Sequence, residues 1–262
     1  DLHSFPTRRS SDLTNGQMRA AATTPAARPS AGAPPTVSVY DTTLRDGAQQ
    51  QSVSFTVADK LAVARLLDGL GVAYIEGGWP GAVPKDTEFF ARARDELDLT
   101  TSRLAAFGST CRAGAAAEHD EQVRALIDSG APVVTIVAKS DPLHVERALR
   151  TAAAENLRMV RDTVGLLVAA GRETMVDLEH FFDGMRRDPH YGIEVALAAA
   201  RAGAGAVIAC DTNGGTLPGA VAAAVARLRG ALDEAGLPEC VVGIHTHDDA
   251  GLAVAGALAA VG

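Results

Sequence analysis

The amino-acid sequence predicts an α/β fold, a (β/α)₈ TIM barrel, and two observations support this prediction. Short apolar runs typical of strands recur about every 34 residues, and segments with helical periodicity lie between them. Such an alternation produces a parallel sheet covered by helices. The chain has 262 residues, which is enough to bury a core of this kind. Seven repeats favour a barrel, and a doubly wound open sheet is the alternative.

Seven apolar runs are interpreted as strands. They begin at Val37 (VSVY), Val72 (VAYIE), Arg103 (RLAAF), Val133 (VVTIVA), Glu173 (ETMVDL), Ala206 (AVIAC) and Cys240 (CVVGIH). A last helix is predicted from Gly251 to Val261, where the sequence stops. We therefore expect a barrel truncated after its seventh βα unit.

Two of the intervening helices have clear boundaries. Thr56 can cap the first, with Asp59 three residues further on. We expect its inward apolar stripe to consist of Val63, Leu66, Leu67 and Leu70, and Gly69 and Gly71 to end it. The second is predicted from Glu121 to Ser129 and stops at Gly130, with three inward residues, Val123, Leu126 and Ile127.

Composition excludes several classes of function. Hydrophobic residues make up 47% and charged residues 21% of the chain, as in ordinary globular proteins. The net charge of −8 argues against non-specific nucleic-acid binding. No apolar run approaches the roughly 18 residues of a membrane span. The three cysteines form no CxxC pair, which favours reduced thiols and a cytoplasmic location.

Residues 1–35 differ from the rest in composition. They are rich in Pro, Ala, Ser, Thr and Arg and have little apolar periodicity, so we expect a disordered or non-native leader. Its segment FPTRRSSDL resembles a translated sequencing adapter. Residues 36–262 are predicted to form the partial barrel that carries the function.

Polar residues follow most of the predicted strands, at the edge where the chemistry of such barrels lies. His245 and His247 are two apart and face the same side of a strand, so both can present a ring nitrogen to one point. Asp46 can supply an opposing oxygen ligand, and this set suits Zn²⁺, Mn²⁺, Co²⁺ or Mg²⁺. A hydrogen-bonded pair of core histidines is the alternative. The strand ends carry Arg45, Asp46, Glu76, Glu179, His180, Asp211, Thr212, Asn213, His245, His247, Asp248 and Asp249.

Six motifs in order resemble a known family. DTTLRDGAQ, YIEGGWPG, AFGST, DLEHFFDG, CDTNGGTLP and HTHDDAGLAVA are similar to the metal-dependent acyl-CoA condensing enzymes and lyases built on the DTTLRDG barrel. That family includes isopropylmalate, homocitrate and citramalate synthases and hydroxymethylglutaryl-CoA lyase. The resemblance extends from Val37 to the end of the sequence. EGGWPG followed by PKD, together with EHFFDG, looks most like the citramalate synthase branch.

The resemblance implies a role for each matching residue. Asp46, His245 and His247 would bind a divalent metal ion. Arg45 would contact the keto-acid oxygen, with Glu76 supporting it at the substrate site. Thr212 would hold the substrate carboxylate, and Glu179 would be the catalytic base. From the residues alone, Glu179 could equally stabilise a helix start and Thr212 a turn.

The reaction implied is condensation of acetyl-CoA with pyruvate to citramalate and CoA, in isoleucine biosynthesis. The implied partners are these small molecules and, in the full-length enzyme, a second subunit of a homodimer. Synthesis of isopropylmalate or homocitrate from a larger 2-oxo acid, or an inactive fragment, are the alternatives.

The sequence also departs from the family pattern. Asp248 stands where the family usually has Asn, and VAKSDPLHV differs from the usual end of the fourth strand. The family's eighth-strand motif, which resembles GERxGN, is absent from this sequence.

Overall fold

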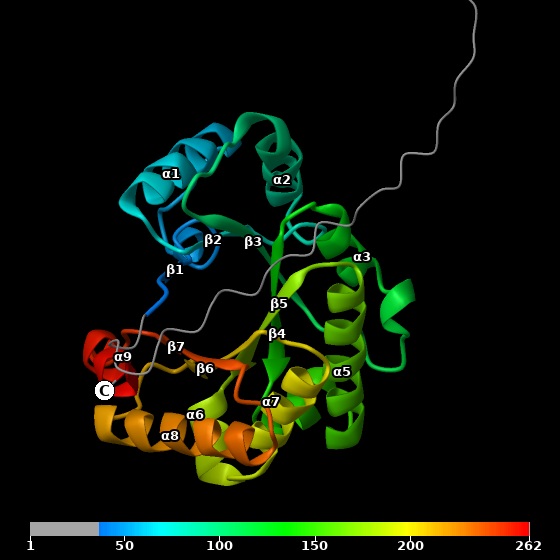
Figure 1. Ribbon diagram of the computed structural model, residues 1–262, viewed down its shortest axis with the longest axis vertical. Helices are drawn as coiled ribbons and strands as arrows, with labels where there is room; N and C mark the ends of the chain where they lie inside the picture. Colours follow the sequence, from blue (N-terminus) through cyan, green and yellow to red (C-terminus); the bar gives the residue numbers. More distant parts are fainter. Residues whose placement is uncertain (1–36, 262) are drawn as a thin grey trace, which may run out of the picture. The chain divides into compact units, whose positions relative to one another are not determined.

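The computed structural model describes residues 37–261, in which seven parallel strands form one sheet (Figure 1). They pair strictly in sequence order, from β1 to β7. A doubly wound sheet reverses its order at a switch point, so that alternative is excluded and the TIM-barrel topology is confirmed. The strands are β1 (Tyr40–Asp41), β2 (Tyr74–Gly78), β3 (Arg103–Ser109), β4 (Val133–Lys139), β5 (Glu173–Glu179), β6 (Ala206–Asp211) and β7 (Val241–Thr246).

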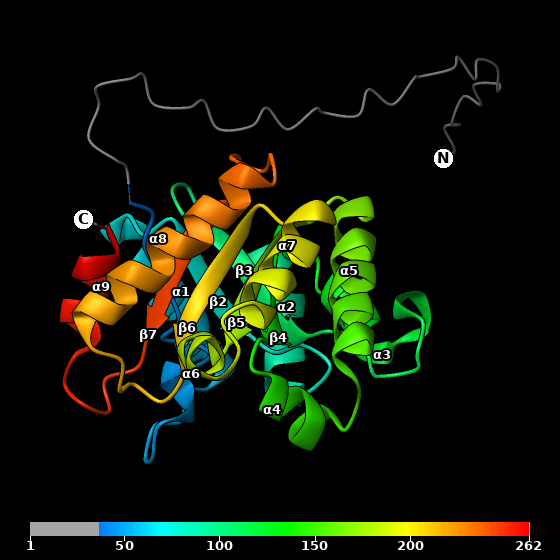
Figure 2. The same ribbon diagram turned by 90° about the horizontal axis from the view of Figure 1, so that it is seen from below.

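Helices connect the strands and cover one face of the curled sheet (Figures 1 and 2). They are α1 (Val57–Leu70), α2 (Pro84–Glu96), α3 (Glu121–Asp128), α4 (Pro142–His144), α5 (Ala153–Ala169), α6 (Phe181–Arg187), α7 (Tyr191–Arg201), α8 (Pro218–Glu234) and α9 (Ala253–Val261). Short 3₁₀ turns lie at Gly47–Gln49 and Ala117–His119, and a π-helical turn at Val145–Leu149. The prediction for residues 1–35 lies outside the described residues.

Alternation along the strands separates two apolar clusters. In β5, Val176 and Leu178 belong to the large cluster beneath the helices, whereas Met175 belongs to a small cluster on the inner face. Since successive side chains point to opposite faces, Asp177 and Glu179 lie on the inner face too, further toward the carboxyl end. The small cluster contains Ala105, Val133, Met175 and Ala206, with Tyr40, Tyr74 and Ile208 packed against it. This small cluster lies on the inner face beneath the polar residues at the carboxyl ends of the strands.

The start of α1 agrees with the sequence, but its buried face does not. The Thr56 hydroxyl accepts from the Asp59 N–H and the Asp59 carboxylate accepts from the Thr56 N–H, which confirms the capping box. The predicted stripe is wrong for Leu66 and Leu70, which are 73% and 77% exposed. The predicted Val63 and Leu67 do pack against the core. The buried residues of the helix are Val57, Lys60, Leu61, Ala64 and Asp68. Lys60 is buried because its ammonium donates to Asp86 and to the Gly77 carbonyl.

The predicted inward residues of α3 agree better with the structure. Val123 and Leu126 are fully buried, and Ile127 packs against the same cluster.

Strand β1, the first in the sheet order, is shorter than predicted. Val37 and Val39 are 60% and 57% exposed, and pairing with β2 begins only at Tyr40.

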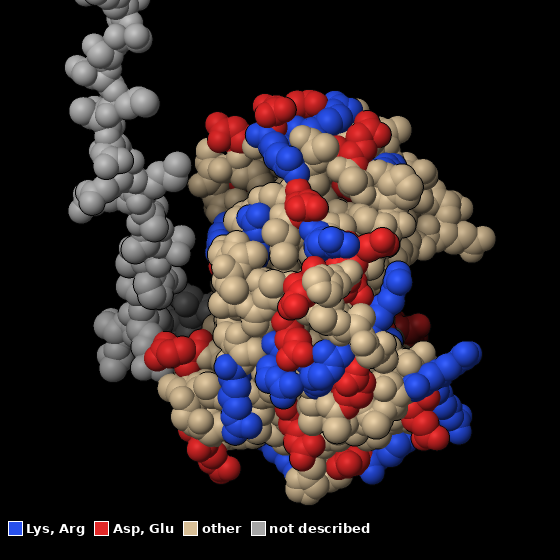
Figure 3. All heavy atoms as spheres, turned by 90° about the vertical axis from the view of Figure 1, so that its right-hand side faces the viewer, with Lys and Arg blue, Asp and Glu red and all other residues tan. Residues whose placement is uncertain are grey.

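The surface carries charges of both signs. On the face shown in Figure 3, basic and acidic side chains are interspersed. None of the helices within residues 37–261 is long and apolar enough to cross a membrane. The three cysteines are buried and form no disulfide in this part of the chain.

Candidate functional site

The curl of the sheet brings the end of β1 to the end of β7. The Asp46 Oδ2 atom lies 3.4 Å from His245 Nε2 and 3.5 Å from His247 Nε2. Two ligands held about 2.1 Å from one ion are roughly 3.0–3.5 Å apart, so these separations fit a shared divalent cation. The three donor atoms all lie within 4.8 Å of one another. The residues present can therefore hold a metal ion.

Further contacts orient the two imidazoles. His247 Nδ1 lies 2.8 Å from the Thr212 carbonyl oxygen, which can only accept, so Nδ1 carries the hydrogen and Nε2 is left free to bind a metal. His245 Nδ1 lies 4.0 Å from the Asp177 carboxylate. The contact with His245, and then the charge of Arg45, lower the pKa of Asp46 to about 2. Asp46 is therefore an anion at neutral pH.

Arg45 is held from three sides. Its Nε donates to Glu76 Oε1 at 2.5 Å and its Nη1 to Asp46 Oδ1 at 3.1 Å. Its guanidinium carbon lies 3.7 Å from the centre of the Phe107 ring. Glu76, 1% exposed, is fixed in turn by the Tyr40 hydroxyl, which donates to Oε2 at 2.6 Å. The cation is thus preorganised beside the candidate metal ligands.

Thr212 and Glu179 make contacts that sequence did not predict. The Thr212 hydroxyl accepts from the His180 backbone N–H at 2.8 Å. This bond depends on the left-handed backbone of His180, with φ 58° and ψ 31°, which is uncommon for a residue with a side chain. The Glu179 carboxylate forms an ion pair with Lys139, which is its register partner on β4. Helix α6 begins after His180 without a side-chain cap, so the carboxylate of Glu179 does not cap it.

Sequence reasoning missed Asp177 and Lys139. Asp177 lies on the inner face beneath Glu179, and burial, followed by the charge of Glu76, raises its pKa. Its position two residues before Glu179, inside an apolar run, was a usable signal. Lys139 lies in the unusual VAKSDPLHV segment, but only the register of β4 and β5 reveals its partner.

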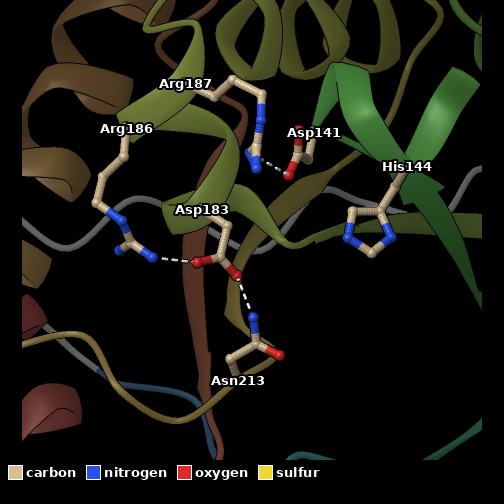
Figure 4. A pocket seen from close by; sticks show the side chains of 6 residues that line it. All are labelled: Asp141, His144, Asp183, Arg186, Arg187 and Asn213. Atoms are coloured by element: carbon tan, nitrogen blue, oxygen red, sulfur yellow. Dashed lines mark hydrogen bonds and ion pairs between the residues drawn. The ribbon is translucent and has the colours of Figure 1, made fainter. Parts of the chain in front are cut away.

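Two cavities open at the carboxyl ends of the strands. One, of about 460 Å³, is lined by Thr42, Asp46, Gly47, Gln49, Gln50, His245, Thr246, His247 and Asp248 and contains the candidate metal ligands. The other, of about 410 Å³, is lined by Asp141, His144, Asp183, Arg186, Arg187 and Asn213 (Figure 4). In it, Arg186 and Asn213 both donate to Asp183, and Arg187 donates to Asp141. The ring of His144 stacks on His180 at 3.8 Å between centres, which places His180 beside this second cavity.

Comparisons with known proteins agree with this arrangement. A family model described as HMGL-like matches residues 36–262. The (R)-citramalate synthase of Streptomyces coelicolor is 59% identical over 85% of this chain, and the 2-isopropylmalate synthase of Stenotrophomonas maltophilia is 35% identical over 87%. The chain spans 41% and 42% of the lengths of these two relatives.

Solved structures show the same fold. The hydroxymethylglutaryl-CoA lyase from Pseudomonas aeruginosa superposes with a TM-score of 0.71 at 21% identity, covering 87% of this chain and 73% of that one. The family model spans the whole described part of the chain and shows which family it belongs to. The chain belongs to the HMGL-like family.

Proposed function

We propose that this chain is the catalytic barrel region of an enzyme that condenses acetyl-CoA with pyruvate, giving citramalate and CoA. The observation that carries the proposal is the Asp46, His245 and His247 group beside a fixed Arg45. Greater identity to a citramalate synthase than to a 2-isopropylmalate synthase supports pyruvate as the 2-oxo acid. Isoleucine biosynthesis is the corresponding metabolic role.

Asp46, His245 and His247 would hold a divalent ion, which when bound polarises the ketone of the 2-oxo acid. Zn²⁺, Mn²⁺, Co²⁺ and Mg²⁺ are the candidates, and the ligand types alone do not choose among them. A cytoplasmic location and a homodimer remain predictions.

Two residues would bind the 2-oxo acid. Arg45 stays cationic and has several donors, so it would stabilise negative charge on the ketone oxygen. Glu76 would keep its guanidinium in place through Nε. Because the Thr212 oxygen already accepts from the His180 N–H, its own hydrogen is free to donate to the substrate carboxylate.

Glu179 would act as the base. It would take a proton from the methyl group of acetyl-CoA, and the resulting enolate carbon would attack the ketone carbon. The ketone oxygen then takes up the electron pair and a proton. Hydrolysis of the thioester releases CoA and makes the sequence irreversible.

Release of CoA by the full-length protein across 2-oxo acids of increasing size tests the proposal. We expect kcat/KM to be highest with pyruvate and to fall with each added carbon, because a larger side chain must fit the same site. A maximum with a larger 2-oxo acid would instead assign isopropylmalate or homocitrate synthesis. No release with any 2-oxo acid would reject a condensing enzyme.

A further inference from the structure

Resting on the proposed function, we propose that Lys139 binds the thioester oxygen of acetyl-CoA and holds the negative charge that forms there when Glu179 removes the methyl proton. Arg45 would serve the ketone oxygen and Lys139 the thioester oxygen. The two oxygens that become negative would thus each have a cation of their own.

Lys139 and Glu179 lie on the inner face of the sheet, the face that the proposed reaction requires. Lys139 is the last residue of β4, and Glu179 is its register partner at the end of β5. Val133 and Met175, which precede them on these strands by an even number of residues, lie in the inner cluster. Lys139 and Glu179 therefore point inward as well. Their side chains are 23% and 25% exposed, so substrate can reach them.

The backbone around the pair is held firmly. The Ser140 N–H and its hydroxyl both donate to the Glu179 carbonyl, at 3.1 and 2.7 Å, and tie the two strand ends together. The Lys139 carbonyl accepts from the side-chain amide of Asn156 at 2.9 Å. Asn156 is fully buried, and the same amide nitrogen donates to the Tyr191 hydroxyl at 2.8 Å. Such support is what a preorganised charge requires.

The charges explain why a base would be paired with a cation. An ammonium has three N–H donors, and within residues 37–261 Glu179 is the acceptor for one of them. When Glu179 takes the proton it becomes neutral, and the new negative charge lies on the thioester oxygen. Lys139 then exchanges one anionic partner for another, and the net charge of the site is unchanged.

Each electron pair in the proposed step has a source and a destination. A carboxylate oxygen of Glu179 takes the methyl proton, and the C–H pair becomes the C=C bond of the enolate. The π pair of the thioester carbonyl moves to its oxygen, which accepts hydrogen bonds from Lys139. When the enolate carbon bonds to the ketone carbon, the thioester carbonyl forms again, and the ketone π pair moves to the oxygen beside Arg45.

The test compares Lys139→Met, Lys139→Arg and Arg186→Met in the full-length protein by CoA release with acetyl-CoA and pyruvate. Arg186 is a matched control, because it is also paired with a carboxylate, Asp183, at the same edge of the sheet (Figure 4). We expect Lys139→Met to lower kcat by about 10²–10³, the usual effect of losing one oxyanion donor. Lys139→Arg should retain part of the activity, and Arg186→Met should stay within a few-fold of the wild type.

A purely structural ion pair predicts a different result. If the pair only joins two strands, Lys139→Met keeps kcat within a few-fold of the wild type, and that result overturns the proposal. The rise in melting temperature with Mn²⁺ and the KM for pyruvate should match the wild type in Lys139→Met, which shows that the fold and the metal site are intact. If Lys139→Met instead loses the rise in melting temperature and has a much higher KM for pyruvate, Lys139 is structural and the proposal is overturned. A wild type inactive with every 2-oxo acid would reject the proposed function itself and this role with it.

Discussion

At the scale of single residues, the neighbours Arg45 and Asp46 have separate partners. Arg45 turns its Nε to Glu76, while Asp46 turns its Oδ2 to His245 in β7 and to His247 just after β7. The bond between the pair, at 3.1 Å, uses the other carboxylate oxygen of Asp46. One cation and one candidate metal ligand therefore lie side by side, and each keeps its own further partners.

A metal ion that binds only the folded chain should raise its melting temperature. We expect such a rise with Mn²⁺ or Zn²⁺ for the wild type, measured by thermal unfolding against EDTA. His245→Ala should abolish most of the rise, because it removes one of three donor atoms. His119→Ala, at an exposed histidine outside the site, is the control and should keep the full rise. A wild type that melts at one temperature with and without metal would refute the site.

The role of Glu179 as base has a kinetic signature. Glu179→Gln keeps the size and a polar end but cannot accept the methyl proton, so kcat should fall by roughly 10² or more. The KM for pyruvate should change little, because pyruvate would bind through Arg45 and Thr212. Glu96→Gln, which also removes an ion-paired carboxylate but at an exposed position of α2, is the control. Activity within a few-fold of the wild type in Glu179→Gln would place the base elsewhere, with His180 the next candidate.

At the scale of elements, local patterns could be predicted and tertiary partners could not. The runs that begin at Arg103, Val133 and Glu173 start β3, β4 and β5 at the same residues, since alternation and flanking glycines are local signals. The inward stripe of α1 was wrong for Leu66 and Leu70, because a helix with apolar residues on two sides does not reveal which side is buried. Burial of Lys60 depends on Asp86, from another helix. The Lys139–Glu179 pair likewise needs the register between two strands.

The end of α1 is joined to a loop through a single carboxylate. Asp68 accepts from the backbone N–H groups of Ser102, Thr101 and Thr100 at 2.7, 2.8 and 3.0 Å. These bonds, with that from Ser102 the strongest, hold the pKa of Asp68 below its usual value. The carboxylate thereby anchors the loop between α2 and β3 to α1.

This anchor predicts a pH dependence of stability. The folded chain protonates Asp68 less readily than the unfolded chain does, so the stabilisation is complete above the unfolded pKa of about 3.9 and is lost as pH falls toward the folded value. Asp68→Asn cannot titrate. In urea unfolding of the full-length protein, the wild type should exceed Asp68→Asn in stability most above about pH 5, and the difference should shrink toward pH 3. A difference that is constant over this range would show that the charge of Asp68 is unimportant.

At the scale of the whole described chain, the candidate metal site joins the two strands at the ends of the sheet order. Asp46 follows β1, His245 lies in β7 and His247 follows it, yet these strands do not pair with each other within residues 37–261. Side chains at the carboxyl ends of the two strands contact each other. The geometry of the site therefore depends on how the sheet edges are covered.

Those edges predict how residues 36–262 behave when they are produced alone. Strands β1 and β7 each pair on one side only among the described residues, and unpaired strand edges are templates for association. Apolar side chains are exposed along them or on the adjacent helices, namely Val37 (60%), Val39 (57%), Leu66 (73%), Leu70 (77%), Val241 (61%), Val254 (74%) and Leu258 (69%). We expect this polypeptide to be oligomeric or poorly soluble in size-exclusion chromatography with light scattering, and to lack condensing activity.

Lysine at an edge opposes strand pairing, because its charge would be desolvated in a new sheet. The double variant Val39→Lys/Val241→Lys should therefore shift the same polypeptide toward the monomer. Lysines placed at Leu217 and Val168, which are also exposed but belong to neither β1 nor β7, provide the control and should leave association unchanged. If the unaltered polypeptide is a soluble, active monomer with a cooperative melt, the edges are closed in a way that its strand pairing does not reveal. If only the control variant dissociates the oligomer, association occurs through the helices and not through the edges of the sheet.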